Sequence, residues 1–183
     1  MNRSLPVTLL AAAISLGFAG CTSNAPASKG DQSAMSLSSQ DQSSAIARYV
    51  AGEDNDFGDL QGDPVARSSG DYSYYETTFP IPGSSECDVY VEKKANDHFG
   101  DCDFNVTSLA DAKTLYKTWV ANVQSTEPSW KSIEVDPLPP DTLMAVLLSD
   151  TQEVHGCYVS LAKNDGKGYR VSTTFAKVSA LKS

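Results

Sequence analysis

Positive charge is scarce in this sequence. The 183 residues include 14 Lys and Arg against 23 Asp and Glu, which gives a formal net charge of -9 at pH 7. Nucleic-acid binding depends on basic patches that neutralise phosphates, so nucleic acid is a poor candidate partner. An acidic surface is repelled by anionic lipid headgroups and attracts cationic proteins or peptides.

Recognisable catalytic and metal-binding motifs are also missing. The sequence has no glycine-rich phosphate loop, no G-x-S-x-G elbow and no cluster with metal-ligand spacing. It has two histidines, His98 and His155, and pairing of one with Cys157 as nucleophile and base is a minor alternative. A carboxylate pair for glycoside hydrolysis is another. The pattern therefore predicts no cofactor and no metal site, and favours a binding protein over an enzyme.

Long hydrophobic runs are absent too. The apolar stretch from Leu5 to Phe18 is shorter than the roughly 20 residues that a membrane-spanning helix needs. It follows a start with one charge, Arg3, and precedes the small residues Ala19 and Gly20. This layout predicts a secretory signal over residues 1–20.

The segment "FAGC", which ends at Cys21, resembles the lipobox of bacterial lipoproteins. The resemblance covers residues 1–22, and Phe18 stands where that family usually has an aliphatic residue. It implies cleavage before Cys21 and attachment of lipid, palmitate included, to that cysteine, which gives stable anchoring. Thr22, in place of an Asp after the cysteine, implies the outer membrane. We expect a lipid-anchored outer-membrane protein that faces the periplasm.

The segment after Cys21 is polar. Residues 22–44 are rich in Ser, Gln, Ala and Asp and have too little apolar content to form a core. We assign residues 21–70 to the lipidated cysteine and a flexible tether, and residues 71–183 to a globular domain. Within the tether, "SSAIARYVAG" has the pattern of a short helix, and the acidic segment that follows is a poor match to a calcium loop.

The globular part has alternating and helical patterns. "CDVYVEK" and "DCDFNV" alternate apolar and polar residues around a turn, which predicts a hairpin with one apolar and one acidic face. Residues 108–126 repeat apolar positions at helical spacing after Ser108, a good N-cap. Four further strands are predicted after this helix, and no internal repeat is visible. The expected fold is α+β: a mainly antiparallel sheet with one amphipathic helix packed on one face.

Three cysteines remain once Cys21 is lipidated. Cys87, Cys102 and Cys157 all fall on predicted core faces, and an oxidising compartment favours one disulfide. Cys87 and Cys102 lie on facing strands of one hairpin and form the favoured pair, although Cys157 could capture either.

The outward face of the predicted sheet combines aromatic and acidic side chains. Tyrosine offers contact area and a polar tip at little entropic cost, and is enriched at recognition surfaces. We take as candidate partner-binding residues Tyr90, Tyr158, Asp88, Glu92 and Asp103. The alternative is a solvated sheet face with cross-strand tyrosine pairs.

The functional hypothesis is a membrane-anchored periplasmic lipoprotein whose small acidic domain binds a protein partner. In one version it is an inhibitor or immunity protein of a cationic envelope-active enzyme. In a second version it is an accessory subunit of an envelope assembly or secretion complex. A cell-envelope enzyme is the alternative class.

Overall fold

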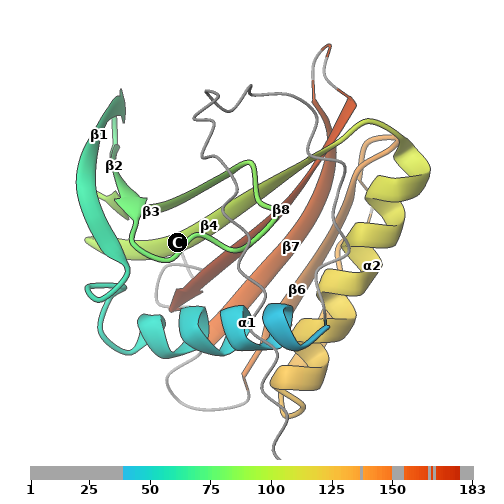
Figure 1. The fold of residues 1–183 in the computed structure, drawn as a ribbon, viewed down its shortest axis with the longest axis horizontal. Coiled ribbons are helices and arrows are strands. Elements are labelled where there is room, and N and C mark those ends of the chain that lie inside the picture. Colours follow the sequence, from blue (N-terminus) through green and yellow to red (C-terminus); the bar gives the residue numbers. More distant parts are fainter. Residues whose placement is uncertain (1–38, 137, 150–154, 165, 167, 178–183) are drawn as a thin grey trace, which may run out of the picture. The chain divides into compact units, whose positions relative to one another are not determined.

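The computed structural model describes residues 39–136, 138–149, 155–164, 166 and 168–177. Cys21, the predicted signal and residues 22–38 of the predicted tether lie outside these residues. The described part belongs to one compact unit. Its elements are α1 (Ser39–Glu53), β1 (Gln61–Ser69), β2 (Tyr72–Thr77), β3 (Glu86–Glu92), β4 (Asp97–Val106), α2 (Leu109–Thr126), β5 (Lys131–Glu134), β6 (Leu143–Leu148), β7 (His155–Asn164) and β8 (Gly168–Lys177) (Figure 1).

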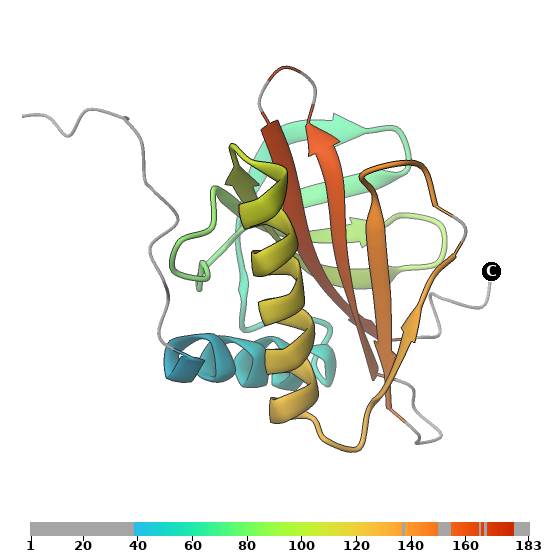
Figure 2. The ribbon, with the colours of Figure 1, turned by 90° about the vertical axis from the view of Figure 1, so that its right-hand side faces the viewer.

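All eight strands of the described part form one antiparallel sheet, in the order β1-β2-β3-β4-β8-β7-β6-β5. Both helices pack on the same face of this sheet: the ring of Tyr49 in α1 contacts Phe175, and the ring of Trp119 in α2 contacts Phe104. Figure 2 shows α2 lying over the strands of the second half of the chain, with its axis running roughly along them. The predicted α+β class is confirmed, and the short helix predicted within the tether is α1, which packs on the sheet beside the expected α2.

The connectivity repeats within the chain. α1 is followed by four strands, α2 is followed by four strands, and the last strands of the two halves, β4 and β8, pair at the centre of the sheet. The repeat is invisible in the sequence because the halves share an order of elements and not a pattern of residues. β1 and β5 are left as the two edges of the sheet.

Residues 39–69 are folded, which corrects the predicted boundary of the tether at residue 70. α1 buries Ile46 and Tyr49 completely, and β1 adds a strand to the edge of the sheet. The polar composition of this region is misleading because a few apolar side chains on one helical face suffice to attach α1 to the sheet. β1 has no alternation to detect, since it is an edge strand whose register with β2 shifts twice.

α2 begins and packs as its sequence predicts. The Ser108 side chain accepts a hydrogen bond from the Asp111 backbone N–H and donates one to the Asp111 carboxylate, which caps the first turn. Ala112, Tyr116, Trp119 and Val123 are buried against the sheet. Within the described residues, neither helix is long and apolar enough to cross a membrane.

The predicted faces of the β3–β4 hairpin are confirmed. Cys87 lies opposite Cys102, and Asp88 lies opposite Asp101. The two cysteines form the favoured disulfide on the helix-covered face, and Cys157 is a buried free thiol. Since strand residues alternate between faces, the acidic and tyrosine positions lie on the opposite face, which carries no helix and is called the helix-free face below.

Candidate functional site

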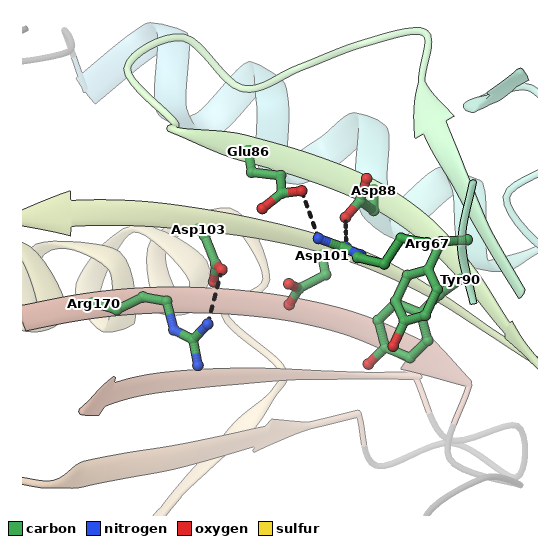
Figure 3. Close-up of a pocket in the computed structure, with 8 residues that line it drawn as sticks. Arg67, Glu86, Asp88, Tyr90, Asp101, Asp103 and Arg170 are labelled. Atoms are coloured by element: carbon green, nitrogen blue, oxygen red, sulfur yellow. Dashed lines mark hydrogen bonds and ion pairs between the residues drawn. The ribbon is translucent and has the colours of Figure 1, made fainter. Parts of the chain in front are cut away.

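The helix-free face contains a pocket of about 340 Å³ over β1, β2, β3, β4 and β8 (Figure 3). Four carboxylates, two guanidinium groups and two tyrosines line it: Glu86, Asp88, Asp101, Asp103, Arg67, Arg170, Tyr74 and Tyr90. We call it the acidic pocket. Neighbouring antiparallel strands place these side chains on one face at matched register positions, so residues distant in the sequence converge.

Three of the five predicted partner-binding residues line the acidic pocket, namely Asp88, Tyr90 and Asp103. Glu92 does not line it: its carboxylate accepts hydrogen bonds from the Lys94 and Ala95 backbone N–H groups and so stabilises the β3–β4 turn. Glu92 is therefore removed from the candidate site on structural grounds.

Tyr158 lies beside the acidic pocket instead of lining it. It sits on β7 opposite Thr174, and Thr174 in turn lies opposite Asp101 on β4. Its ring is half-buried, and this burial raises the pKa of its hydroxyl group. Tyr158 thus extends the helix-free face beyond the pocket.

Arg67 reaches the pocket from the edge strand β1, a role that no pattern in the sequence predicts. Its guanidinium forms ion pairs with Glu86, at 2.6 Å, and with Asp88, and it lies 4.6 Å from the centre of the Tyr74 ring. Asp88 is only 8% exposed, so it is not the solvated side chain that the alternation suggested. Burial raises its pKa, and the neighbouring Arg67 opposes that effect.

Arg170 holds the other side of the pocket. Its Nη1 lies 3.3 Å from Oδ2 of Asp103, and the Ser172 hydroxyl donates a hydrogen bond to the same carboxylate. Arg170 and Ser172 belong to β8, next to Asp103 on β4. Asp103 therefore has both a cation and a hydroxyl donor, and it is oriented from the centre of the sheet.

Asp101 lies between these two ion-paired groups (Figure 3). Its Oδ1 accepts a hydrogen bond of 2.5 Å from the Thr174 hydroxyl. In the described part of the chain, no Lys or Arg forms an ion pair with it, and its Oδ2 has no hydrogen-bond partner. Burial raises the pKa of Asp101 to about 7, and the neighbouring Asp103 adds to that effect. Asp101 is thus an acid that gains or loses its proton near neutral pH.

Tyr90 forms part of an aromatic wall. Its ring stacks on Phe99, with centroids 4.7 Å apart and an interplanar angle of 11°, and it contacts the rings of Tyr72 and Tyr74 at 5.7 Å. The ring is half-buried, and burial raises the pKa of its hydroxyl group above the ordinary value. The expectation of a freely exposed tyrosine is corrected: neighbouring aromatic rings hold the Tyr90 ring in place at the side of the pocket.

A second group of ionisable side chains lies on the helix-covered side. His155 Nδ1 is 2.7 Å from Oε2 of the fully buried Glu53, and His155 Nε2 is 3.6 Å from Oδ1 of Asp54. Cys157 is completely buried, and burial raises the pKa of its thiol well above the ordinary value. No hydrogen bond links Cys157 to either histidine within the described residues. The arrangement does not provide the activated thiolate that a nucleophilic cysteine needs.

Metal binding has no support in the described residues, where no three His, Cys, Asp or Glu side chains are arranged to hold an ion. Comparison with known proteins gives no further guidance: no family model, no curated protein and no solved structure matches this chain.

Proposed function

We propose that the protein is an outer-membrane lipoprotein, anchored through Cys21 and facing the periplasm, whose domain binds a protein partner at the acidic pocket. The observation that carries the proposal is the pocket itself. A merely solvated sheet face would have separate exposed side chains, whereas this face collects four carboxylates, two arginines and two tyrosines around one cavity.

The pocket is ordered in advance of binding. Arg67 links β1 to two carboxylates of β3, and Arg170 and Ser172 fix Asp103. A binding surface whose side chains are already held loses less conformational entropy when the partner arrives. Tyrosine and arginine are also the residue types that most often dominate protein interfaces.

The charge balance favours a basic partner. The formal net charge of the chain is -9, and the acidic pocket contains two more carboxylates than guanidinium groups. Such a field steers cationic proteins toward the site and repels acidic ones. An inhibitor or immunity protein of a cationic envelope-active enzyme fits this chemistry, and so does an accessory subunit of an envelope assembly or secretion complex.

One observation favours an envelope enzyme as the second candidate. Asp101 lies opposite Asp88 in the register, and its pKa of about 7 is suited to a general acid. Asp88 is already paired with Arg67, which leaves it less available as a second catalytic carboxylate. Hydrolysis of peptidoglycan glycan strands by the purified protein, lost on Asp101→Asn, would favour this candidate over binding alone.

The test of the main proposal is affinity capture from envelope extract. The full-length lipidated protein is compared with a double variant of the pocket, Asp88→Asn with Asp103→Asn. The matched control is Asp56→Asn with Asp63→Asn, which removes the same charge from two exposed aspartates outside the pocket.

We expect a basic envelope protein to be captured by the wild type and the control, and lost from the pocket variant. One basic hydrolase would indicate the inhibitor role, and a set of assembly components would indicate the accessory role. Capture of the same proteins by all three forms would contradict binding at this pocket.

A further inference from the structure

Among the described residues, one acid of the pocket, Asp101, forms no ion pair, and Arg170 acts on it only from a distance. Glu86 and Asp88 share Arg67, and Asp103 is paired with Arg170. Asp101 is flanked by all of these groups but has only the Thr174 hydroxyl as a hydrogen-bond donor in the described part of the chain. Figure 3 shows its carboxylate between the two arginines and turned into the cavity. A positive charge placed there would complete the charge pairing of the pocket.

The protein already shows how this pocket binds a guanidinium. Arg67 of β1 lies over the face of Tyr74 on the neighbouring strand β2 and pairs with two carboxylates of β3, the strand beyond it. An aromatic face together with carboxylate oxygens is the combination that recognises arginine and, less selectively, lysine. Tyr90 offers a second aromatic surface in the same pocket, and Asp101 lies on the strand beside it. Tyr90 and Asp101 therefore supply a second tyrosine and a second carboxylate for a cation, with one face of the Tyr90 ring covered by Phe99.

We propose that the partner protein inserts a single lysine or arginine side chain into the acidic pocket, where Asp101 is its counter-ion and Tyr90 is its aromatic wall. This inference rests on the proposed function and specifies the partner at the same site. A cavity of about 340 Å³ is at the lower end of the range for ligand sites, which suits one long side chain better than a folded segment. The aromatic walls favour an organic cation over a metal ion.

Binding of such a cation is coupled to proton release. When Asp101 is protonated, the incoming positive charge displaces the proton to solvent and the carboxylate remains as its partner. Because burial raises the pKa of Asp101 to about 7, the protonated form dominates at pH 6 and the ionised form at pH 8. The affinity for a cation should therefore rise across this range, by about tenfold for a single group with this pKa.

Other ionisable groups surround Asp101 on every neighbouring element. They are Tyr49 of α1, Arg67 of β1, Tyr74 of β2, Glu86, Asp88 and Tyr90 of β3, Asp103 of β4, Arg170 of β8, and Cys157 and Tyr158 of β7. Burial raises the pKa values of Cys157 and of three of the tyrosines, which keeps these groups neutral at pH 6 to 8. Asp101 is thus the group in the pocket to which we assign the pH dependence.

The experiment is a titration of the full-length lipidated protein, in micelles of an uncharged detergent, with small probes followed by NMR. The probes are N-acetyl-arginine amide, N-acetyl-lysine amide and, as a neutral isostere of the arginine probe, N-acetyl-citrulline amide. Calcium chloride alone tests for a metal ion. Shifts of backbone amide signals are measured at pH 6 and pH 8 at constant ionic strength.

We expect both cationic probes to shift the signals of Asp101, Thr174 and Tyr90, with an affinity about tenfold higher at pH 8 than at pH 6. Asp101→Asn keeps the acceptor for Thr174 but loses the charge, so its affinity should fall below the wild-type value at pH 6 and become independent of pH. Asp63→Asn removes an exposed charge outside the pocket and should behave as the wild type. Preserved amide spectra of Asp101→Asn establish that the variant is folded.

Three results would overturn the inference: equal binding of the citrulline probe, an unchanged pH dependence in Asp101→Asn, or calcium binding at the same signals that excludes the arginine probe. These failures differ from failure of the proposed function. If envelope extract yields a partner that Asp101→Asn still captures with wild-type affinity at pH 8, the face binds protein without this cation. If the probes bind but no partner is captured, the pocket recognises cations and the protein-binding role is wrong.

Discussion

Oε2 of Glu53, in the last turn of α1, lies 2.7 Å from Nδ1 of His155, the first residue of β7. Glu53 is fully buried, and its Oε1 has no hydrogen-bond partner among the described residues. A buried carboxylate with an unpartnered oxygen is costly when ionised. Burial, reinforced by the neighbouring Asp54, accordingly raises the pKa of Glu53 to about 9.

The burial of Glu53 predicts that the free energy of unfolding falls at alkaline pH. The pKa of Glu53 is higher in the folded state than its ordinary value of 4.5, so its stabilising contribution is complete below pH 4.5 and is lost as pH rises to about 9. Glu53→Gln removes the titration and keeps a hydrogen-bonding side chain beside His155. We expect the wild type to lose about 2 kcal/mol or more of unfolding free energy relative to this variant between pH 5 and pH 9.

Urea denaturation at a series of pH values measures this difference. Glu134→Gln, a change at an exposed position of β5, is the control and should follow the wild-type profile. Parallel profiles for the wild type and Glu53→Gln would show that Glu53 is not protonated preferentially in the folded protein.

Tyr90 should contribute to stability as well as to binding. Its ring stacks on Phe99 and contacts two further tyrosines, so Tyr90→Ala removes a packed aromatic wall. We expect a loss of about 1–3 kcal/mol in unfolding free energy. Tyr90→Phe keeps the ring and should stay within about 0.5 kcal/mol of the wild type. Thermal unfolding of the three proteins measures these differences in stability. A Tyr90→Ala protein as stable as the wild type would mean that the ring is freely exposed.

The disulfide between Cys87 and Cys102 closes a segment with a sequence separation of 15 residues. In the chain-entropy model, its loss costs about 3 kcal/mol, so the double variant Cys87→Ala with Cys102→Ala should unfold at a clearly lower urea concentration. Cys157 is buried and free. In protein purified in its proposed lipidated form, where the Cys21 sulfur carries lipid, maleimide should therefore label one thiol per molecule after unfolding without reduction and none in the folded state. Three labelled thiols after unfolding would contradict the pairing.

The sequence predicted the elements whose patterns are local. The alternation around Cys87 and Cys102 fixed the faces of the hairpin, and the stripe that includes Trp119 fixed the buried side of α2, because each pattern repeats within one element. The segment around Tyr49 looked like a tether because its composition is polar. It folds because other parts of the chain supply the surface that covers Tyr49 and Ile46, and no local pattern contains that information.

The sequence predicted only part of the candidate site, because its patterns are local and some contacts of the site are not. Period-two alternation placed Asp88, Tyr90 and Asp103 on one face correctly. It could not show that Arg67 pairs with Asp88 or that Arg170 pairs with Asp103. Each of these ion pairs joins side chains on different strands, and the pattern within one strand does not tell which strands lie close together. Exposure was misjudged for Asp88 because alternation tells which face a side chain occupies, and not whether neighbouring side chains on that face cover it.

The proposed membrane anchor is tested by changes at Cys21 and at the residue that follows it. We expect Cys21→Ser to abolish palmitate labelling and to release the protein into the soluble fraction, because the variant lacks the sulfur to which we propose that the anchoring lipid is attached. Thr22→Asp is the matched variant: it keeps the cysteine and should keep the label, but by resemblance to bacterial lipoproteins it should move the protein to the inner membrane. Labelling with radioactive palmitate, followed by separation of the two membranes on a density gradient, measures both effects. A Cys21→Ser protein that still carries label and still sediments with the outer membrane would mean that the anchor lies elsewhere. A labelled Thr22→Asp protein that still sediments with the outer membrane would agree with lipid on Cys21 and would contradict the sorting role proposed for residue 22.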